Sequence, residues 1–280
     1  MLDRADIPSG FRAIPAPPMP LARLVEGRPV EEVAEILPRL FNLCRVAQSV
    51  ALRLALGLPA GDMAGLSEEI ARDHRLKLGV IWPARLGLGR LALPLWSEGL
   101  PETPEAFDAF ISGVAPLATV LRAVRDGFTP GLACCAPLPE VVAATALAAT
   151  AQENSPAARH LTHPVMRRIE ETDGRGPLWR VFARALDLAA VTRGALPAPQ
   201  LIGPGAALVP AARGLYAVRA EVRRGRVIRL TRVTPTDHLL APEGIMAQSL
   251  ASLPATAHSE ARLVADLLDP CAPVTIEGGA

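Results

Sequence analysis

Apolar residues recur at helical spacing through the first two thirds of the chain. The stretch PRLFNLCRVAQSVALRLALG repeats them three and four positions apart, at Leu40, Leu43, Ala47, Val50, Ala51, Leu54 and Leu58. Residues at this spacing share one face of a helix, and Gly57 and Pro59 are typical stop signals. The pattern therefore predicts an amphipathic helix with Cys44 near its amino end.

Similar patterns predict further helices as far as residue 193. One begins after Ser67 and runs through EEIARDHRLKL. Another has Thr103 as N-cap and Pro104 at its first position, and it ends at Gly127. Its apolar stripe comprises Phe107, Phe110, Ile111, Leu117 and Leu121. Helical segments are also predicted at 138–150, 156–171 and 178–193.

The pattern changes after residue 194. The segment LPAPQLIGPGAALVPAARG is so rich in proline and glycine that we expect no regular element there. LYAVRAEV and VIRLTRV then alternate as strands do, and RRGR between them predicts a β-hairpin over 215–234. A loop and a short helix around 261–268 lead to Asp-Pro-Cys. The expected fold is mainly α with a small β-hairpin near the C-terminal end: one domain over 23–280, after a flexible Pro-rich arm over 1–22.

Composition narrows the possible partners. Half of the residues are apolar and a fifth are charged, as in ordinary globular proteins, and the net charge is +1. Nucleic-acid binding normally requires a basic excess, so we expect no nucleic-acid partner and interpret VRRGRVIRLTR as a solvated hairpin. The apolar run at 141–151 is too short to span a bilayer, and the N-terminus has no apolar signal region. We expect no membrane insertion, a cytoplasmic location and reduced thiols.

The four cysteines form no Cys-x-x-Cys pair, so the sequence contains no complete zinc or iron–sulfur motif. We interpret Cys134 and Cys135 as small buried hydrophobic residues. Cys44 on an apolar helix is more often a core residue than a ligand, whereas for Cys271 near the chain end the residues alone favour neither interpretation. The histidines in RHLTH have no acid or thiol at ligand spacing, which favours a helix face, and we assign no chemistry to His74.

Two distant segments, RLFNLC at 39–44 and LDPC at 268–271, carry a family resemblance. The chain resembles the large subunit of nickel–iron hydrogenases. That family has Arg-x-Cys-Gly-x-Cys-x-x-x-His near its N-terminus and Asp-Pro-Cys-x-x-Cys-x-x-His at its C-terminus. The matching residues here are Arg39, Cys44, Asp269, Pro270 and Cys271.

Both motifs are incomplete in this chain. Phe41 and Val274 replace one cysteine each, and Asn42, Gln48 and Glu277 replace the glycine and the two histidines. In the hydrogenases, four thiolates hold nickel, and two of them bridge to an iron carrying two cyanides and one carbon monoxide. With only two cysteines retained, the resemblance implies no nickel and no hydrogen activation, hence no enzyme.

A third block resembles the same family. VPAARGLY, the hairpin and VTPTDHLLAPEG are similar to the region that surrounds the diatomic ligands of the iron, which implies this role for Arg213, Pro235 and Thr236. His238 and Leu239 replace the family's tryptophan and asparagine. RDHRLKL, with His74, resembles the helix that follows the first motif.

The pattern is most similar to the HupK (HoxV-type) accessory proteins of hydrogenase maturation. The resemblance implies a non-catalytic scaffold that holds or transfers the Fe(CN)2(CO) fragment through Cys44 and Cys271. Its partners would be hydrogenase maturation proteins and an immature hydrogenase large subunit. We expect Arg213 and Thr236 to donate to cyanide nitrogens, and the helix amino end to keep the Cys44 sulfur ionised. Two alternatives stay open: a docking module without cargo, and a divergent hydrogenase-type redox subunit.

Overall fold

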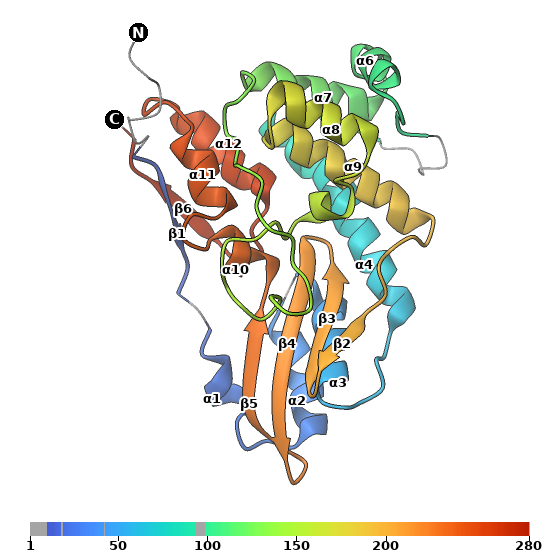
Figure 1. The fold of residues 1–280 in the computed structure, drawn as a ribbon, viewed down its shortest axis with the longest axis vertical. Helices are drawn as coiled ribbons and strands as arrows, with labels where there is room; N and C mark the ends of the chain where they lie inside the picture. Colours follow the sequence, from blue (N-terminus) through green and yellow to red (C-terminus); the bar gives the residue numbers. More distant parts are fainter. Residues whose placement is uncertain (1–9, 18, 42, 93–98, 280) are drawn as a thin grey trace.

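The computed structural model describes residues 10–17, 19–41, 43–92 and 99–279 (Figure 1). A group of helices covers one end of the molecule and a four-stranded sheet forms the other. Between residues 21 and 85 the helices are α1 (Leu21–Val25), α2 (Val30–Ile36), a 3-10 turn (Leu37–Leu40), α3 (Arg45–Ala55), α4 (Met63–Leu76), a π-helical turn (Lys77–Ile81) and α5 (Trp82–Arg85). Between residues 104 and 192 they are α6 (Pro104–Ser112), α7 (Pro116–Gly127), a 3-10 turn (Pro156–Arg159), α8 (Pro164–Asp173) and α9 (Pro177–Thr192).

Helix α9 is the centre of the helical part. Fifteen of its 16 residues are buried, from Pro177 to Val191, and it contacts α4, α7, α8 and α12 (His258–Leu268). A helix that is buried all round belongs to the core of a large domain. Three polar residues, Arg180, Arg184 and Asp187, are nevertheless buried on it, which positions charge inside the core.

The β part is larger than the predicted hairpin. Strands β2 (Gln200–Gly203), β3 (Ala206–Ala211), β4 (Gly214–Arg223) and β5 (Arg226–Val233) form one antiparallel sheet in that order, and α3 packs against β3 and β4. The expectation of no regular element over 195–214 is therefore wrong. Its proline and glycine lie largely at turns, with Pro204 and Gly205 joining β2 to β3, while the apolar β3 is buried along its whole length.

Other predicted helices need correction. Residues 138–150 form no helix: residues 143–147 are turns, and the Gln152 side-chain amide donates to the carbonyls of Thr145 and Ala148. The segment 103–127 breaks into α6 and α7 before Pro116, and 156–171 breaks before Pro164, as expected where proline disfavours helix in the preceding residue. Leu40 and Leu43 precede α3 and are exposed.

The expected loose arm contains an ordered strand. Strand β1 (Arg12–Pro15) pairs antiparallel with β6 (Val274–Glu277), and the two lie side by side in Figure 1. Beyond the strands the backbones approach so closely that a Cβ on Gly278 would lie 1.9 Å from the Gly10 carbonyl oxygen. Part of the arm, residues 1–9, lies outside the described residues.

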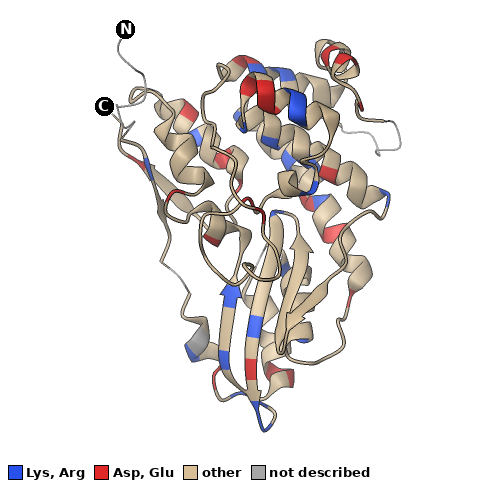
Figure 2. Cartoon of the chain, in the orientation of Figure 1, with Lys and Arg blue, Asp and Glu red and all other residues tan. Residues whose placement is uncertain are grey.

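The remaining C-terminal elements are α10 (Pro235–Leu239) and α11 (Ile245–Ala251), which lead from the sheet to α12. Arg223, Arg224, Arg226 and Arg229 of the predicted hairpin are exposed, as expected, whereas Arg232 is half-buried; basic residues are seen along β4 and β5 and at the turn between them (Figure 2). Within the described ranges, no single helix is both long enough and apolar enough to cross a membrane. Helices α6 and α7 reach the required length and hydropathy only when they are taken together, and they meet at an angle of 95°.

Candidate functional site

Cys44 lies directly before α3, as its N-cap residue, with a left-handed backbone (φ 52°). The amide groups that open the helix, on Val46 and Ala47, donate to the Glu69 carboxylate at 2.8 and 3.1 Å. The expectation that the helix end keeps the sulfur ionised is therefore wrong. Burial raises the pKa of Cys44 to about 12; Arg213 opposes this, while Asp73, Glu69 and Cys271 reinforce it.

Arg213 joins the two motif regions. Its Nη1 donates to the Cys44 sulfur at 3.4 Å, and its Nε donates to the backbone carbonyl of Asp269 at 3.0 Å. Its Nη2 contacts the carboxylates of Asp269 (3.1 Å) and Asp73 (3.4 Å). One buried guanidinium thus bridges residues 44 and 269, which are 225 positions apart in sequence.

Asp269 is the centre of a buried charge cluster. It caps the end of α12 in a left-handed conformation (φ 54°) and forms ion pairs with Lys77 (2.6 Å), Arg184 (3.0 Å) and Arg213. Burial alone would raise the pKa of Asp269, but these cations outweigh it and lower the pKa below its ordinary value. Asp73 also pairs with Arg184 and Arg213, so three cations pair with these two carboxylates, and Arg213 links the cluster to Cys44.

Cys271 contacts a neutral partner. The Thr236 hydroxyl donates to its sulfur at 2.9 Å and accepts from its backbone amide at 2.7 Å. Thr234, rather than Thr236, caps α10, in a capping box with Asp237, and Pro235 occupies the first position of that helix. This division of roles leaves the Thr236 side chain available to contact Cys271.

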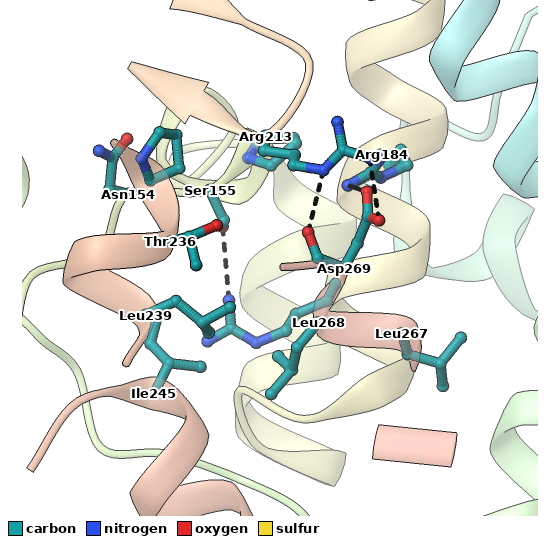
Figure 3. A pocket seen from close by; sticks show the side chains of 13 residues that line it. Asn154, Ser155, Arg184, Arg213, Thr236, Leu239, Ile245, Leu267, Leu268 and Asp269 are labelled. Atoms are coloured by element: carbon teal, nitrogen blue, oxygen red, sulfur yellow. Dashed lines mark hydrogen bonds and ion pairs between the residues drawn. The ribbon is translucent and has the colours of Figure 1, made fainter. Parts of the chain in front are cut away.

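A small cavity, with about 30 Å³ open to the centre of a water molecule, adjoins these groups (Figure 3); Arg213 and Thr236, the partners of the two sulfurs, line it, whereas Cys44 and Cys271 do not. Arg213, Pro235 and Thr236, the three residues predicted to surround the diatomic ligands, all line it. The other lining residues are Asn154, Ser155, Pro156, Arg180, Arg184, Leu239, Ile245, Leu267, Leu268 and Asp269. The wall therefore combines buried cations and hydroxyls with an apolar surface.

The described replacements Phe41, Gln48 and Val274 contact other parts of the molecule. The Phe41 ring lies 4.6 Å from the guanidinium of Arg232, and Val274 is in β6 opposite Pro15. Gln48 is buried and accepts from Tyr216 and Arg232. Asn42 lies outside the described residues. In the described part of the chain, no three His, Cys, Asp or Glu side chains are grouped as metal ligands.

The histidines and the paired cysteines have structural contacts. His74 is fully buried and hydrogen-bonded to Asp187 at 2.8 Å, and His238 lies between Asn154 and the Ala148 carbonyl. Of the RHLTH histidines, His160 contacts Asp187, and His163 caps α8. Cys135 is buried as predicted, whereas Cys134 is half-buried. The sequence analysis missed the site residues Asp73, Lys77, Arg180 and Arg184; charged residues inside the apolar pattern of α9 were the available signal.

The chain is 48% identical over 276 residues to the hydrogenase expression/formation protein HupK of Rhodobacter capsulatus, covering 94% of this chain and 91% of that protein. It belongs to the HupK family. It is also 30% identical to HupK of Azotobacter vinelandii, over 80% of this chain and 66% of that protein. A match to HoxV of Cupriavidus necator is 36% identical over 75 residues, 24% of this chain and 20% of that protein. No family model matches the chain.

Solved structures confirm the expected fold. The HupK-family chain superposes on the nickel–iron–selenium hydrogenase of Desulfovibrio vulgaris Hildenborough with a TM-score of 0.59 and 11% identity. The match covers 94% of this chain and 96% of the hydrogenase chain. The G491S variant of that enzyme gives 0.58 and 12%, with the same coverage. The fold is thus that of a hydrogenase large subunit, as the motif resemblance implied.

Proposed function

We propose that this chain is a non-catalytic accessory protein in nickel–iron hydrogenase maturation, which holds the Fe(CN)2(CO) fragment between Cys44 and Cys271 and passes it to an immature large subunit. Membership of a family named for hydrogenase expression and formation supports the general role. The observation that carries the specific role is the bridge by Arg213, which contacts the sulfur of Cys44 and the residue two positions before Cys271.

The residues of the site suit such a cargo. Thiolates are soft donors appropriate to iron, and an iron that brings three diatomic ligands needs few from the protein. Arg213 and Thr236 are donors suited to cyanide nitrogens, while Leu239 and Ile245 offer an apolar surface to carbon monoxide. The Arg213 guanidinium, which contacts the Cys44 sulfur, would offset thiolate charge once binding releases the thiol protons.

The test is anaerobic purification from cells that express the other maturation proteins, followed by infrared spectroscopy and iron analysis. We expect cyanide and carbonyl bands in the wild type, and loss of bands and iron in Cys44→Ala and Cys271→Ala. The matched control is Cys134→Ser, a thiol outside the site, which should keep both. A wild-type protein with no iron and no such bands would contradict the proposal.

Two further readouts separate the alternatives. If the protein is only a docking module, a variant with serine at both positions 44 and 271 will support full hydrogenase maturation. If it is a divergent hydrogenase subunit, the purified protein will contain nickel and take up hydrogen with a dye acceptor. We expect neither result.

A further inference from the structure

Arg180 is a buried cation of α9 that the motif resemblance did not include. It is 7% exposed, and its two terminal nitrogens contact the Glu153 carboxylate at 3.3 and 3.2 Å. The same nitrogens donate to the Ser155 hydroxyl (3.4 Å, the dashed line at Ser155 in Figure 3) and to the Cys135 sulfur (3.1 Å). These contacts fix the plane of the guanidinium.

The third nitrogen of this side chain is different. The Nε–H of Arg180 is buried and has no acceptor among the described residues. Buried donors are nearly always paired, so an unpaired one calls for an explanation, such as a water or a ligand. Arg180 lines the same cavity as Arg213 and Thr236, which is where a missing acceptor could lie.

The other donors of the cavity have partners in this structure, although Nη1 of Arg213 carries a second N–H from which a ligand can accept. Thr236 donates to the Cys271 sulfur, and each nitrogen of Arg213 has a contact to Cys44, Asp269 or Asp73. Arg184 contacts Asp73 and Asp269. Among the fully buried side-chain nitrogens of the described lining residues, Nε of Arg180 is the one without an acceptor.

We propose that Nε–H of Arg180 donates a hydrogen bond to one cyanide nitrogen of the bound iron fragment, so that the α9 wall of the cavity holds a ligand that Arg213 does not. The ligand must be a small acceptor, because the cavity is small and the donor is a single N–H of a cation. An anionic cyanide nitrogen fits this chemistry better than carbon monoxide, a weak acceptor. The inference rests on the proposed function above.

The experiment compares infrared spectra of the loaded wild type with those of Arg180 variants. Arg180→Lys retains a cation for Glu153 but has no N–H at the ε position. We expect one of the two cyanide bands to shift, by more than the carbonyl band, with unchanged iron content. The matched control is Glu153→Gln, which alters the partner of the guanidinium but leaves the Nε–H, and should keep both cyanide bands in place.

A double variant covers the case in which Arg180→Lys fails to fold. Arg180→Met combined with Glu153→Gln removes both charges together and leaves neither buried alone, and it should show the same shift of one band. Cyanide bands that stay in place in a folded Arg180 variant would overturn this inference alone, and would indicate that Nε–H binds water. Absence of all bands from the wild type would overturn the proposed function as well.

Discussion

The sulfur of Cys44 accepts from a guanidinium, whereas that of Cys271 accepts from a hydroxyl. Behind Cys44 lies a buried cluster of Asp73, Asp269 and their cations, fixed by helices α4, α9 and α12. Behind Cys271 lies a short loop that continues into β6, whose partner is the N-terminal strand β1. The two sulfurs therefore differ in their immediate partners: a buried cation at Cys44, and a neutral hydroxyl at Cys271, although Asp269 of the charge cluster lies two residues before Cys271.

The largest expected effect is on the free energy of unfolding when the hydrogen-bond donor of each sulfur, Arg213 or Thr236, is replaced. Arg213→Met leaves the buried carboxylates of Asp73 and Asp269 with fewer cations, and we expect the free energy of unfolding to fall by about 3 kcal/mol. Thr236→Val removes a neutral donor and acceptor, and we expect a loss of about 1 kcal/mol. Urea denaturation monitored by circular dichroism measures both.

Thr236→Ser is the control for that pair. It keeps the hydroxyl and should lie closer to the wild type than Thr236→Val does. Equal losses for Arg213→Met and Thr236→Val would contradict the view that the charged partner of Cys44 contributes more to stability than the neutral partner of Cys271.

The Cys44 side should also respond to acid. Burial lowers the pKa of His74, and Arg184, 3.5 Å from Nδ1, disfavours the cation further, although the bond to Asp187 opposes them. The folded protein keeps this imidazole neutral, while the unfolded chain protonates it below its ordinary pKa of 6.5. Stability is thus present above pH 6.5 and falls as the pH drops, by up to about 1.4 kcal/mol per pH unit for one such group.

Urea denaturation at pH 7.5 and 5.5 tests this response. Burial lowers the pKa of His163 and His238 as well, so these groups add to the slope. The slope should therefore fall, without vanishing, in His74→Gln. A free energy of unfolding that does not change between the two pH values would contradict the prediction.

The sequence predicted the features of the site that depend on local patterns, but not those that depend on contacts between residues far apart in the chain. The helix after Cys44, the hairpin over 215–234 and the grouping of Arg213, Pro235 and Thr236 at one cavity follow local patterns or motif order. The β1–β6 pairing does not, because it joins the two ends of the chain and Pro-rich segments carry no clear strand signal. Nor could the hydrophobic pattern show that the backbone amides at the start of α3 donate to the carboxylate of Glu69, which lies 22 residues beyond Ala47.

The smallest expected effect concerns the ribbon that positions Cys271. Ile276 in β6 is half-buried against the core, opposite Ala13 of β1. Ile276→Ala removes part of that burial, and we expect the ribbon to open more often by about 1 kcal/mol, which is roughly fivefold in population. Because opening exposes the loop before β6, the rate at which iodoacetamide modifies Cys271 should rise by about the same factor.

Mass spectrometry of the Cys271 and Cys44 peptides from one sample measures both rates, and the Cys44 rate should not change. Ile228→Ala, at an exposed isoleucine of β5, is the matched control and should alter neither rate. If Cys44 accelerates together with Cys271, the two sulfurs belong to one cooperative unit and the contrast between the two sides does not extend to their dynamics.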